Sequence, residues 1–161
     1  MRSLSIAGVL VTTLLALSAH GQPPDARQLK DQLTGDAKGA ASGNPQCKLF
    51  TQAEIATYTG VAVGPGENAA GGSGCMWSDK DYESSATVTV VAARYFPEPK
   101  LVPGFRRLPD VGTRGWVAPD AGWSAGTLIK DEAVVVAVSG EKATEASAIA
   151  LLKEVIKRRS K

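Results

Sequence analysis

The first 21 residues constrain the rest of the chain more than any other feature, because they decide in which compartment it folds. A short start with one positive charge, Arg2, precedes an uncharged and mostly apolar run over residues 4–19. Small residues then stand at Ala19 and Gly21, where a cleavage site needs them. This three-part pattern predicts a secretory signal peptide over residues 1–21 and a periplasmic or secreted product.

The alternative to a signal peptide is a membrane anchor. The apolar run has 16 residues, which is short of the ~20 that a helix needs to span a bilayer. No second run approaches that length, so we expect no transmembrane segment in the mature chain. Because the first cysteine is Cys47, we also expect no lipid attachment at the new N-terminus.

An exported chain with two cysteines favours a disulfide, because disulfides form and persist in oxidising compartments. We therefore predict a bond between Cys47 and Cys75, which would stabilise the fold by about 3 kcal/mol in the chain-entropy model. The alternative is a pair of buried free thiols. A zinc site is disfavoured, since two sulfurs without histidine leave the metal short of ligands.

The histidine content excludes several chemistries. The one histidine, His20, lies in the expected leader, so the mature chain would contain none. This argues against Ser-His-Asp and Cys-His nucleophiles and against histidine-ligated zinc. A formal net charge of +2, with 21% charged residues, also argues against a strongly basic nucleic-acid-binding protein. We expect no metal, no cofactor and no nucleic-acid partner.

The mature chain divides into an arm and one domain. Residues 22–46 are polar with almost no large apolar side chain, which predicts a flexible arm. A single domain over 47–159 follows, and its first element is a short helix. Thr51 and Glu54 have the spacing of a capping box, and Gly60 is a suitable C-terminal stop. Glu54 is therefore interpreted as a cap and not as a catalyst.

Hydrophobic periodicity predicts the remaining elements. The clearest strand covers 84–95, with apolar residues on both faces, which favours cover on both sides. Shorter strands are expected over 75–78, 115–118, 123–129 and 133–138, a strand or an extended segment over 61–63, and a helix over 141–159. This order predicts an α+β fold, in which an antiparallel sheet packs against a short N-terminal helix and a long C-terminal helix as an α/β sandwich. The glycine-rich residues 64–74 and the proline-rich residues 96–110 are interpreted as irregular connections.

Short motifs resemble those of a known group of proteins. They are Cys-x-Leu-Phe-Thr-x-x-Glu-Ile over 47–55, Gly60, Gly-Cys-x-Trp over 74–77, and Leu-Pro-Asp-Val-Gly over 108–112. This pattern resembles actinobacterial-type secreted lipoproteins and related exported domains of unknown function, whose fold is similar to the PsbP/Mog1-like α/β sandwich. The resemblance covers about residues 47–159 and implies that fold and the Cys47–Cys75 pairing. It carries over no catalytic residues, and the lipoprotein cysteine is missing here.

Two patterns in the chain are compatible with catalysis. Ser139 and Lys142 match Ser-x-x-Lys, in which lysine helps to activate serine, but no Lys-Thr-Gly partner exists. Ser139 is more simply the N-cap of the last helix. A pair of carboxylates for glycoside hydrolysis is an alternative that the sequence leaves open, because the distance between the two groups depends on the tertiary structure. Glu98, Asp110 and Asp120 are interpreted as loop residues with local roles, so no catalytic residue is predicted.

Tryptophan and arginine supply the candidate binding surface. Trp77 is expected to pack on the disulfide. The other candidates are Arg106, Arg107, Arg114, Trp116 and Trp123. Such residues are enriched at interface hot spots, and guanidinium groups pair with carboxylates while indole faces stack on apolar rings. The surface would suit an envelope protein or a small anionic or sugar-like ligand, and the alternative is that these side chains fill the core.

We therefore expect an exported, disulfide-stabilised, non-enzymatic binding or accessory protein of the bacterial cell envelope. The alternative is an inhibitor or immunity-type protein that acts on a secreted enzyme through the 64–74 or 96–109 loops. A carboxylate-dependent hydrolase ranks third.

Overall fold

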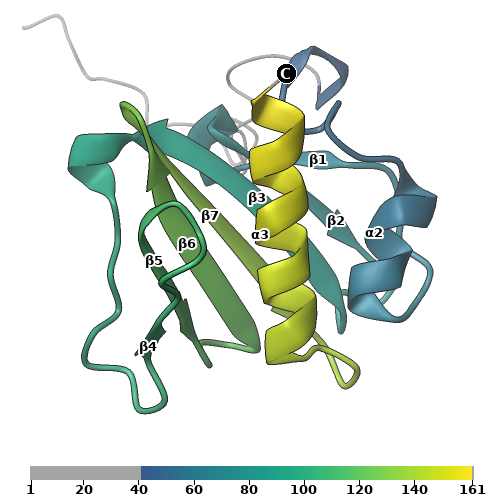
Figure 1. The fold of residues 1–161 in the computed structure, drawn as a ribbon. Helices are drawn as coiled ribbons and strands as arrows, with labels where there is room; N and C mark the ends of the chain where they lie inside the picture. Colours follow the sequence, from purple (N-terminus) through teal and green to yellow (C-terminus); the bar gives the residue numbers. More distant parts are fainter. Residues whose placement is uncertain (1–40, 161) are drawn as a thin grey trace, which may run out of the picture.

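The computed structural model of the chain describes residues 41–160 (Figure 1). The predicted signal peptide and residues 22–40 of the predicted arm lie outside the described residues. Two α-helices are α2 (Gln52–Thr59) and α3 (Glu145–Arg159). The strands are β1 (Glu67–Ala69), β2 (Gly74–Ser78), β3 (Ser85–Ala92), β4 (Arg106–Arg107), β5 (Thr113–Ala118), β6 (Trp123–Ile129) and β7 (Glu132–Ser139). Short 3-10 helices cover Ala41–Gly43 (η2), Ala70–Gly72 (η3) and Ala93–Tyr95 (η4).

The strands form a seven-stranded antiparallel sheet, so the predicted α+β fold class is confirmed. The spatial order is β1-β2-β3-β7-β6-β5-β4, which places the last strand in the sequence beside β3 at the centre. Strands β3 and β7 pair along their whole length, from Ser85 opposite Ser139 to Ala92 opposite Glu132. The strand predicted over 84–95 is therefore central, as expected.

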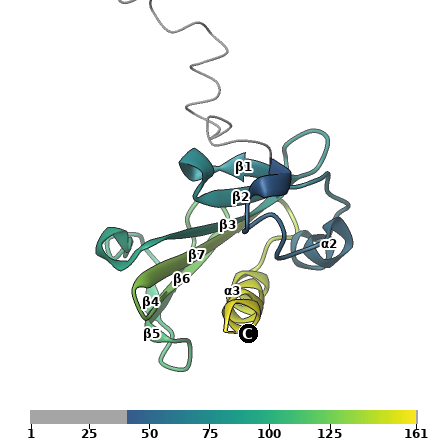
Figure 2. The same cartoon turned by 90° about the horizontal axis from the view of Figure 1, so that it is seen from above.

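Both helices cover the same face of the sheet (Figure 2). On that face the register sets Val88 opposite Cys75 on one side and opposite Val136 on the other. Leu151 and Leu152 of α3 are fully buried against this layer. Removal of these apolar side chains from water is the main stabilising contribution of the fold.

The expected cover on both faces of β3 is wrong. Within residues 41–160 the α-helices lie on one face only, and on the opposite face Thr87, Thr89 and Val91 are half-buried. β-Branched side chains favour a pleated strand through their shape, whether or not a second layer covers them. The apolar residues on the second face of β3 therefore reflect the preference of their side chains for a strand and not burial under a second layer.

Trp77 and the disulfide lie side by side in the core. Trp77 is 1% exposed, and its ring meets Phe50 edge-on with the centroids 6.2 Å apart. Gly66 lies against both, since a Cβ added there would come within 2.6 Å of the Cys75 Sγ and 2.9 Å of the Trp77 Nε1. The expectation that Trp77 packs beside the disulfide agrees with this arrangement.

The predicted capping box of α2 is present. The Glu54 backbone N–H donates to Thr51 Oγ1 over 3.3 Å, and the Thr51 N–H donates to Glu54 Oε2 over 2.8 Å. Arg158 near the end of α3 donates to the same carboxylate over 2.8 Å and stacks on Phe50 at 4.2 Å. The Arg158 hydrogen bond, followed by those from Thr51, lowers the pKa of Glu54 to about 2. Glu54 thus caps one helix and ties it to the other.

Three sequence predictions are corrected at element ends. Of the two alternatives for 61–63, the strand is wrong; the first strand of the described residues is β1, inside the segment interpreted as a glycine-rich connection. Ser139 is not the N-cap of the last helix, because β7 extends to it and its hydroxyl shares a 2.8 Å hydrogen bond with Ser85. The cap is Thr144, whose side chain accepts from the Ser147 N–H. The helix therefore begins at Glu145 and not near 141.

Candidate functional site

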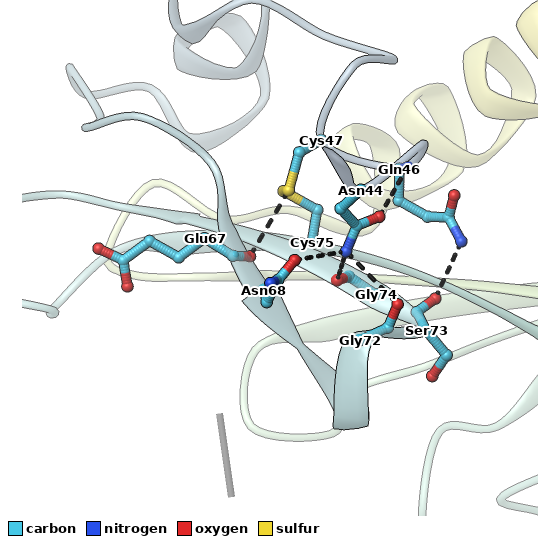
Figure 3. The surroundings of a disulfide bond; sticks show 9 residues. All are labelled: Asn44, Gln46, Cys47, Glu67, Asn68, Gly72, Ser73, Gly74 and Cys75. Atoms are coloured by element: carbon cyan, nitrogen blue, oxygen red, sulfur yellow. Dashed lines mark hydrogen bonds between the residues drawn. A yellow bond between two sulfur atoms is a disulfide. The ribbon is translucent and has the colours of Figure 1, made fainter. Parts of the chain in front are cut away.

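The predicted disulfide joins Cys47 and Cys75, with their Cα atoms 5.1 Å apart (Figure 3). Just before it, Asn44 Nδ2 donates to Asn68 Oδ1 over 2.8 Å and to the Gly74 carbonyl over 2.7 Å. Gln46 Nε2 donates to the Ser73 carbonyl over 3.1 Å. Asn44 and Gln46 are 6% and 7% exposed. The end of the predicted flexible arm is therefore packed, and the folded part includes residues before Cys47.

The structure divides the predicted arginine and tryptophan surface between the two faces of the sheet. Arg106 is paired with Val117 on the helix-covered face, where its guanidinium bonds to Glu145 of α3. Trp123 is half-buried on that face and packs against the core. Arg107 is paired with Trp116 on the opposite face. The five predicted residues do not form one patch.

Arg107 and Arg114 do come together, around the carboxylate of the loop residue Glu98. Glu98 accepts from two Arg107 nitrogens over 2.9 and 3.2 Å and from Arg114 Nε over 2.9 Å. The Lys100 ammonium lies 3.0 Å from the same carboxylate. The side chain of Glu98 is 6% exposed, whereas the side chains of the three cations are about half exposed. Three positive charges thus surround one negative charge, which leaves this surface cationic.

Hydrogen bonds from Arg107 and then Arg114 hold the pKa of the Glu98 carboxyl well below its ordinary value of 4.5. A carboxyl whose pKa is lowered on folding stabilises the folded state fully above the ordinary pKa and loses this contribution as the pH falls. The cluster is therefore ionised and intact throughout the neutral range.

This cluster fixes the connection between η4 and β4, which we call the anchor loop (96–105; Figure 1). Backbone turns bond the Val102 N–H to the Pro99 carbonyl and the Phe105 N–H to the Val102 carbonyl, each over 3.0 Å. At the other end, the Phe105 ring lies over Trp116, with centroids 6.3 Å apart. Between these fixed points, Leu101 is 98% exposed. The loop predicted to be irregular is thus held at its base and displays one large apolar side chain.

Trp116 is a core residue of the uncovered face. It is 2% exposed, lies against Gly126 and is covered by Phe105. Gly126 has no room for a side chain, since an added Cβ would come within 2.8 Å of the Trp116 ring. Trp116 supports the anchor loop from below and offers no surface to a ligand.

Trp123→Ala is expected to lower the free energy of unfolding by about 2 kcal/mol, which is less than the 3–5 kcal/mol typical of a fully buried aromatic residue. The reason is that Trp123 packs against the core while remaining partly exposed. A thermal melt measures this change. As a matched control, exposed Leu101→Ala should leave the midpoint nearly unchanged, and an unchanged midpoint for Trp123→Ala would restore Trp123 as a surface binding residue.

Ser139 and Lys142 do not form a nucleophile pair. Ser139 Oγ is bonded to Ser85 Oγ, whereas Lys142 Nζ donates to the Gly60 carbonyl over 3.3 Å. The Lys142 ammonium thus caps the C-terminal end of α2, where carbonyl groups lack partners within the helix and the helix dipole favours a positive charge. Both residues of the Ser-x-x-Lys match therefore have structural roles, Ser139 in the sheet and Lys142 at the end of α2.

Comparison with protein-family models, curated proteins and solved structures finds no match to this chain. The resemblance to exported lipoprotein-like domains with a PsbP/Mog1-like fold therefore stays a prediction. Within residues 41–160, no helix is long and apolar enough to cross a membrane.

Sequence reasoning missed the residues that organise this site. Glu98 stands in the run Phe-Pro-Glu-Pro-Lys, in which two prolines restrict the backbone on either side of the carboxylate. A lone carboxylate in such a stiff segment, followed by three arginines within 16 residues, was the available signal. The exposure of Leu101 could not be predicted, because it depends on the path that the loop takes.

Proposed function

We propose that the protein is an exported, non-enzymatic binding protein of the bacterial cell envelope, which engages a partner protein through the anchor loop. One observation carries this proposal: Leu101 is 98% exposed, while the side chain of Glu98, three positions earlier, is 6% exposed and held by three cations. The disulfide supports an oxidising compartment outside the cytoplasm.

A loop held in this way binds at low entropic cost. Association must order flexible side chains and loops, and a segment fixed beforehand avoids much of that cost. Interfaces derive most of their affinity from a few anchors that enter pockets on the partner. Leu101 is suited to an apolar pocket, and the surrounding Lys100, Arg107 and Arg114 favour acidic residues at the rim of that pocket.

Four carboxyl groups with lowered pKa values do not fit the role of a general acid. A glycosidase-type general acid needs a carboxyl whose pKa is raised, so that it keeps its proton near neutral pH. In the described part of the chain, the carboxyl groups with resolved shifts are Glu54, Glu98, Glu145 and Glu154, and each pKa is lowered by arginine hydrogen bonds. These groups act as permanent anions in ion pairs.

An inhibitor of a secreted enzyme is the second candidate. The anchor loop favours inhibition because it is exposed and is fixed by its own hydrogen bonds and ion pairs. A rigid loop can occupy an active-site cleft without being reorganised. The two functions differ in one property, which is whether the bound partner loses its enzymatic activity.

Affinity capture from a cell-envelope extract tests the proposal. We expect one stoichiometric partner to be retained by the wild-type protein and by Tyr82→Ser, a control that alters an exposed aromatic residue at the other edge of the sheet. Leu101→Asp should lose this partner, since it places a charge in an apolar pocket. Glu98→Gln should weaken capture in the same assay, because it leaves the cations without their carboxylate and loosens the base of the loop.

Retention of the same proteins by Leu101→Asp and wild type would refute the anchor-loop function. If a partner is found and is an enzyme, its turnover in the presence of excess protein separates inhibition from simple binding.

A further inference from the structure

The indole N–H of Trp116 is a buried donor without an acceptor. Trp116 is 2% exposed, and among the described residues its Nε1 finds no hydrogen-bond partner. Gln46 Oε1 is in the same position, but the amide nitrogen of Gln46 still donates to the Ser73 carbonyl. Buried tryptophan N–H groups normally find an acceptor, and an unpaired one keeps the cost of its removal from water. The closed packing around Trp116 is therefore less favourable than its burial alone suggests.

The two sides of the Trp116 indole are covered in different ways. Beneath it lies β6, where a Cβ added to Gly126 would come within 2.9 Å of the Trp116 Nε1. Above it lies the Phe105 ring, tilted by 32° with the centroids 6.3 Å apart. Among residues 41–160 no α-helix lies on this face of the sheet (Figure 2). Phe105 is thus the part of the cover that can move while the helix-covered core stays closed.

Phe105 ends a tight turn at the edge of the sheet. Its N–H donates to the Val102 carbonyl over 3.0 Å, with Pro103 and Gly104 between them. Gly104 has a φ of +87°, the positive value that the third position of a type II turn requires. β4 follows directly as an edge strand of two residues. Such peripheral segments open at a lower free-energy cost than central strands, so residues 102–105 can lift as one unit, which we call the flap.

The two ends of the anchor loop therefore differ. At the base, the Glu98 carboxylate is held by three cations and gains nothing from opening. At the flap, opening gives the Trp116 N–H water as a partner and removes the contact between the two rings. The lost ring contact keeps the closed form in the majority, while the recovered hydrogen bond raises the open population.

We propose that the flap has an open form in the free protein, in which Phe105 leaves Trp116 while Glu98 keeps the base of the anchor loop in place. Phe105 follows Leu101 by four positions, so the open form adds a second apolar side chain to the surface that Leu101 displays. As regulation of partner binding, this inference rests on the proposed function: a partner that contacts Phe105 selects the open form, and its apparent affinity scales with the open population.

Hydrogen exchange of the indole N–H groups, followed by NMR of the full-length protein without a partner, tests the flap. We expect the Trp116 indole N–H to exchange about tenfold faster than that of Trp77, since a local opening costs less than opening the core. Trp77 is the internal control, because it is 1% exposed and lies in the helix-covered core. Low concentrations of denaturant should leave the Trp116 rate unchanged, because the flap exposes little surface. Equal rates with the same denaturant dependence would overturn the proposal.

Trp116→Phe isolates the unpaired N–H, because it removes the donor and keeps a ring. Exchange of the Phe105 backbone N–H should then slow by about fivefold, the ratio that corresponds to the lower limit for an unpaired buried donor. Phe105→Ala should instead speed up exchange of the Trp116 indole N–H and leave the Trp77 rate unchanged. Tyr82→Ser, at the other edge of the sheet, is the control and should alter none of these rates. Unchanged Phe105 exchange in Trp116→Phe would refute the unpaired N–H as the cause of opening.

Affinity capture separates this regulation from the proposed function. Leu101→Asp reports whether the anchor loop binds a partner at all. Trp116→Phe should weaken capture of that partner by the factor by which it slows Phe105 exchange. Full capture by Trp116→Phe would overturn the regulation while leaving the partner site intact.

Discussion

Trp77→Ala is expected to lower the free energy of unfolding by about 3–5 kcal/mol, the range for a large aromatic side chain removed from a closed core. The side chain is 1% exposed and touches Phe50, while Gly66 closes over its indole nitrogen. The backbone of β2 is held on both sides by pairing with β1 and β3, which opposes collapse into the space left behind. Chemical denaturation at equilibrium measures the loss as a lower midpoint.

Two matched variants separate packing from other effects of this change. Trp77→Phe retains a ring and should be less destabilising than Trp77→Ala. Tyr82→Ser removes an aromatic residue that is 67% exposed and should leave stability nearly unchanged. A loss below about 1 kcal/mol for Trp77→Ala would show that this part of the core is not closely packed.

The double variant Cys47→Ala/Cys75→Ala is expected to lose about 3 kcal/mol of stability, because it releases a long loop in the unfolded state. Alanine at both positions avoids new buried polar groups at Cys75, which is fully buried. Equilibrium unfolding of the variant and of the oxidised wild type gives the difference directly.

Reduction of the wild-type protein is the control for this pair, and it should produce a similar loss. Mass spectrometry of the oxidised protein should give a mass two hydrogen atoms below that of the dithiol. A count of two free thiols in the protein purified without reductant would contradict the disulfide as a native feature.

The sequence predicted those elements well whose pattern lies within one short segment. Thr51 and Glu54 cap α2 as their spacing predicts, and the alternation over 84–95 marks β3. The strands β1 and β4 were missed because they have three and two residues. Such short strands exist because a neighbour pairs with them, so their own residues carry little propensity.

The candidate site was predicted less well, because it depends on which face of the sheet each side chain occupies. Arg106 and Arg107 are adjacent in sequence, and they point to opposite faces because strand residues alternate. Glu98 gathers Arg107 and Arg114 from segments on either side of a turn. The sequence supplies the residue types, whereas the sheet register decides which of them meet.

The central position of β7 sets an order of assembly for the chain. β1, β2 and β3 form one run of consecutive antiparallel strands and β4 to β7 form another, so each half contains only pairings between sequence neighbours. The two halves join through β3 and β7, where Ser85 meets Ser139. Contacts between such distant residues form slowly, since the intervening chain must first be brought together. A chain that emerges from its N-terminus can therefore close the Cys47–Cys75 loop within its first half, whereas the sheet is completed only after the last strand has emerged.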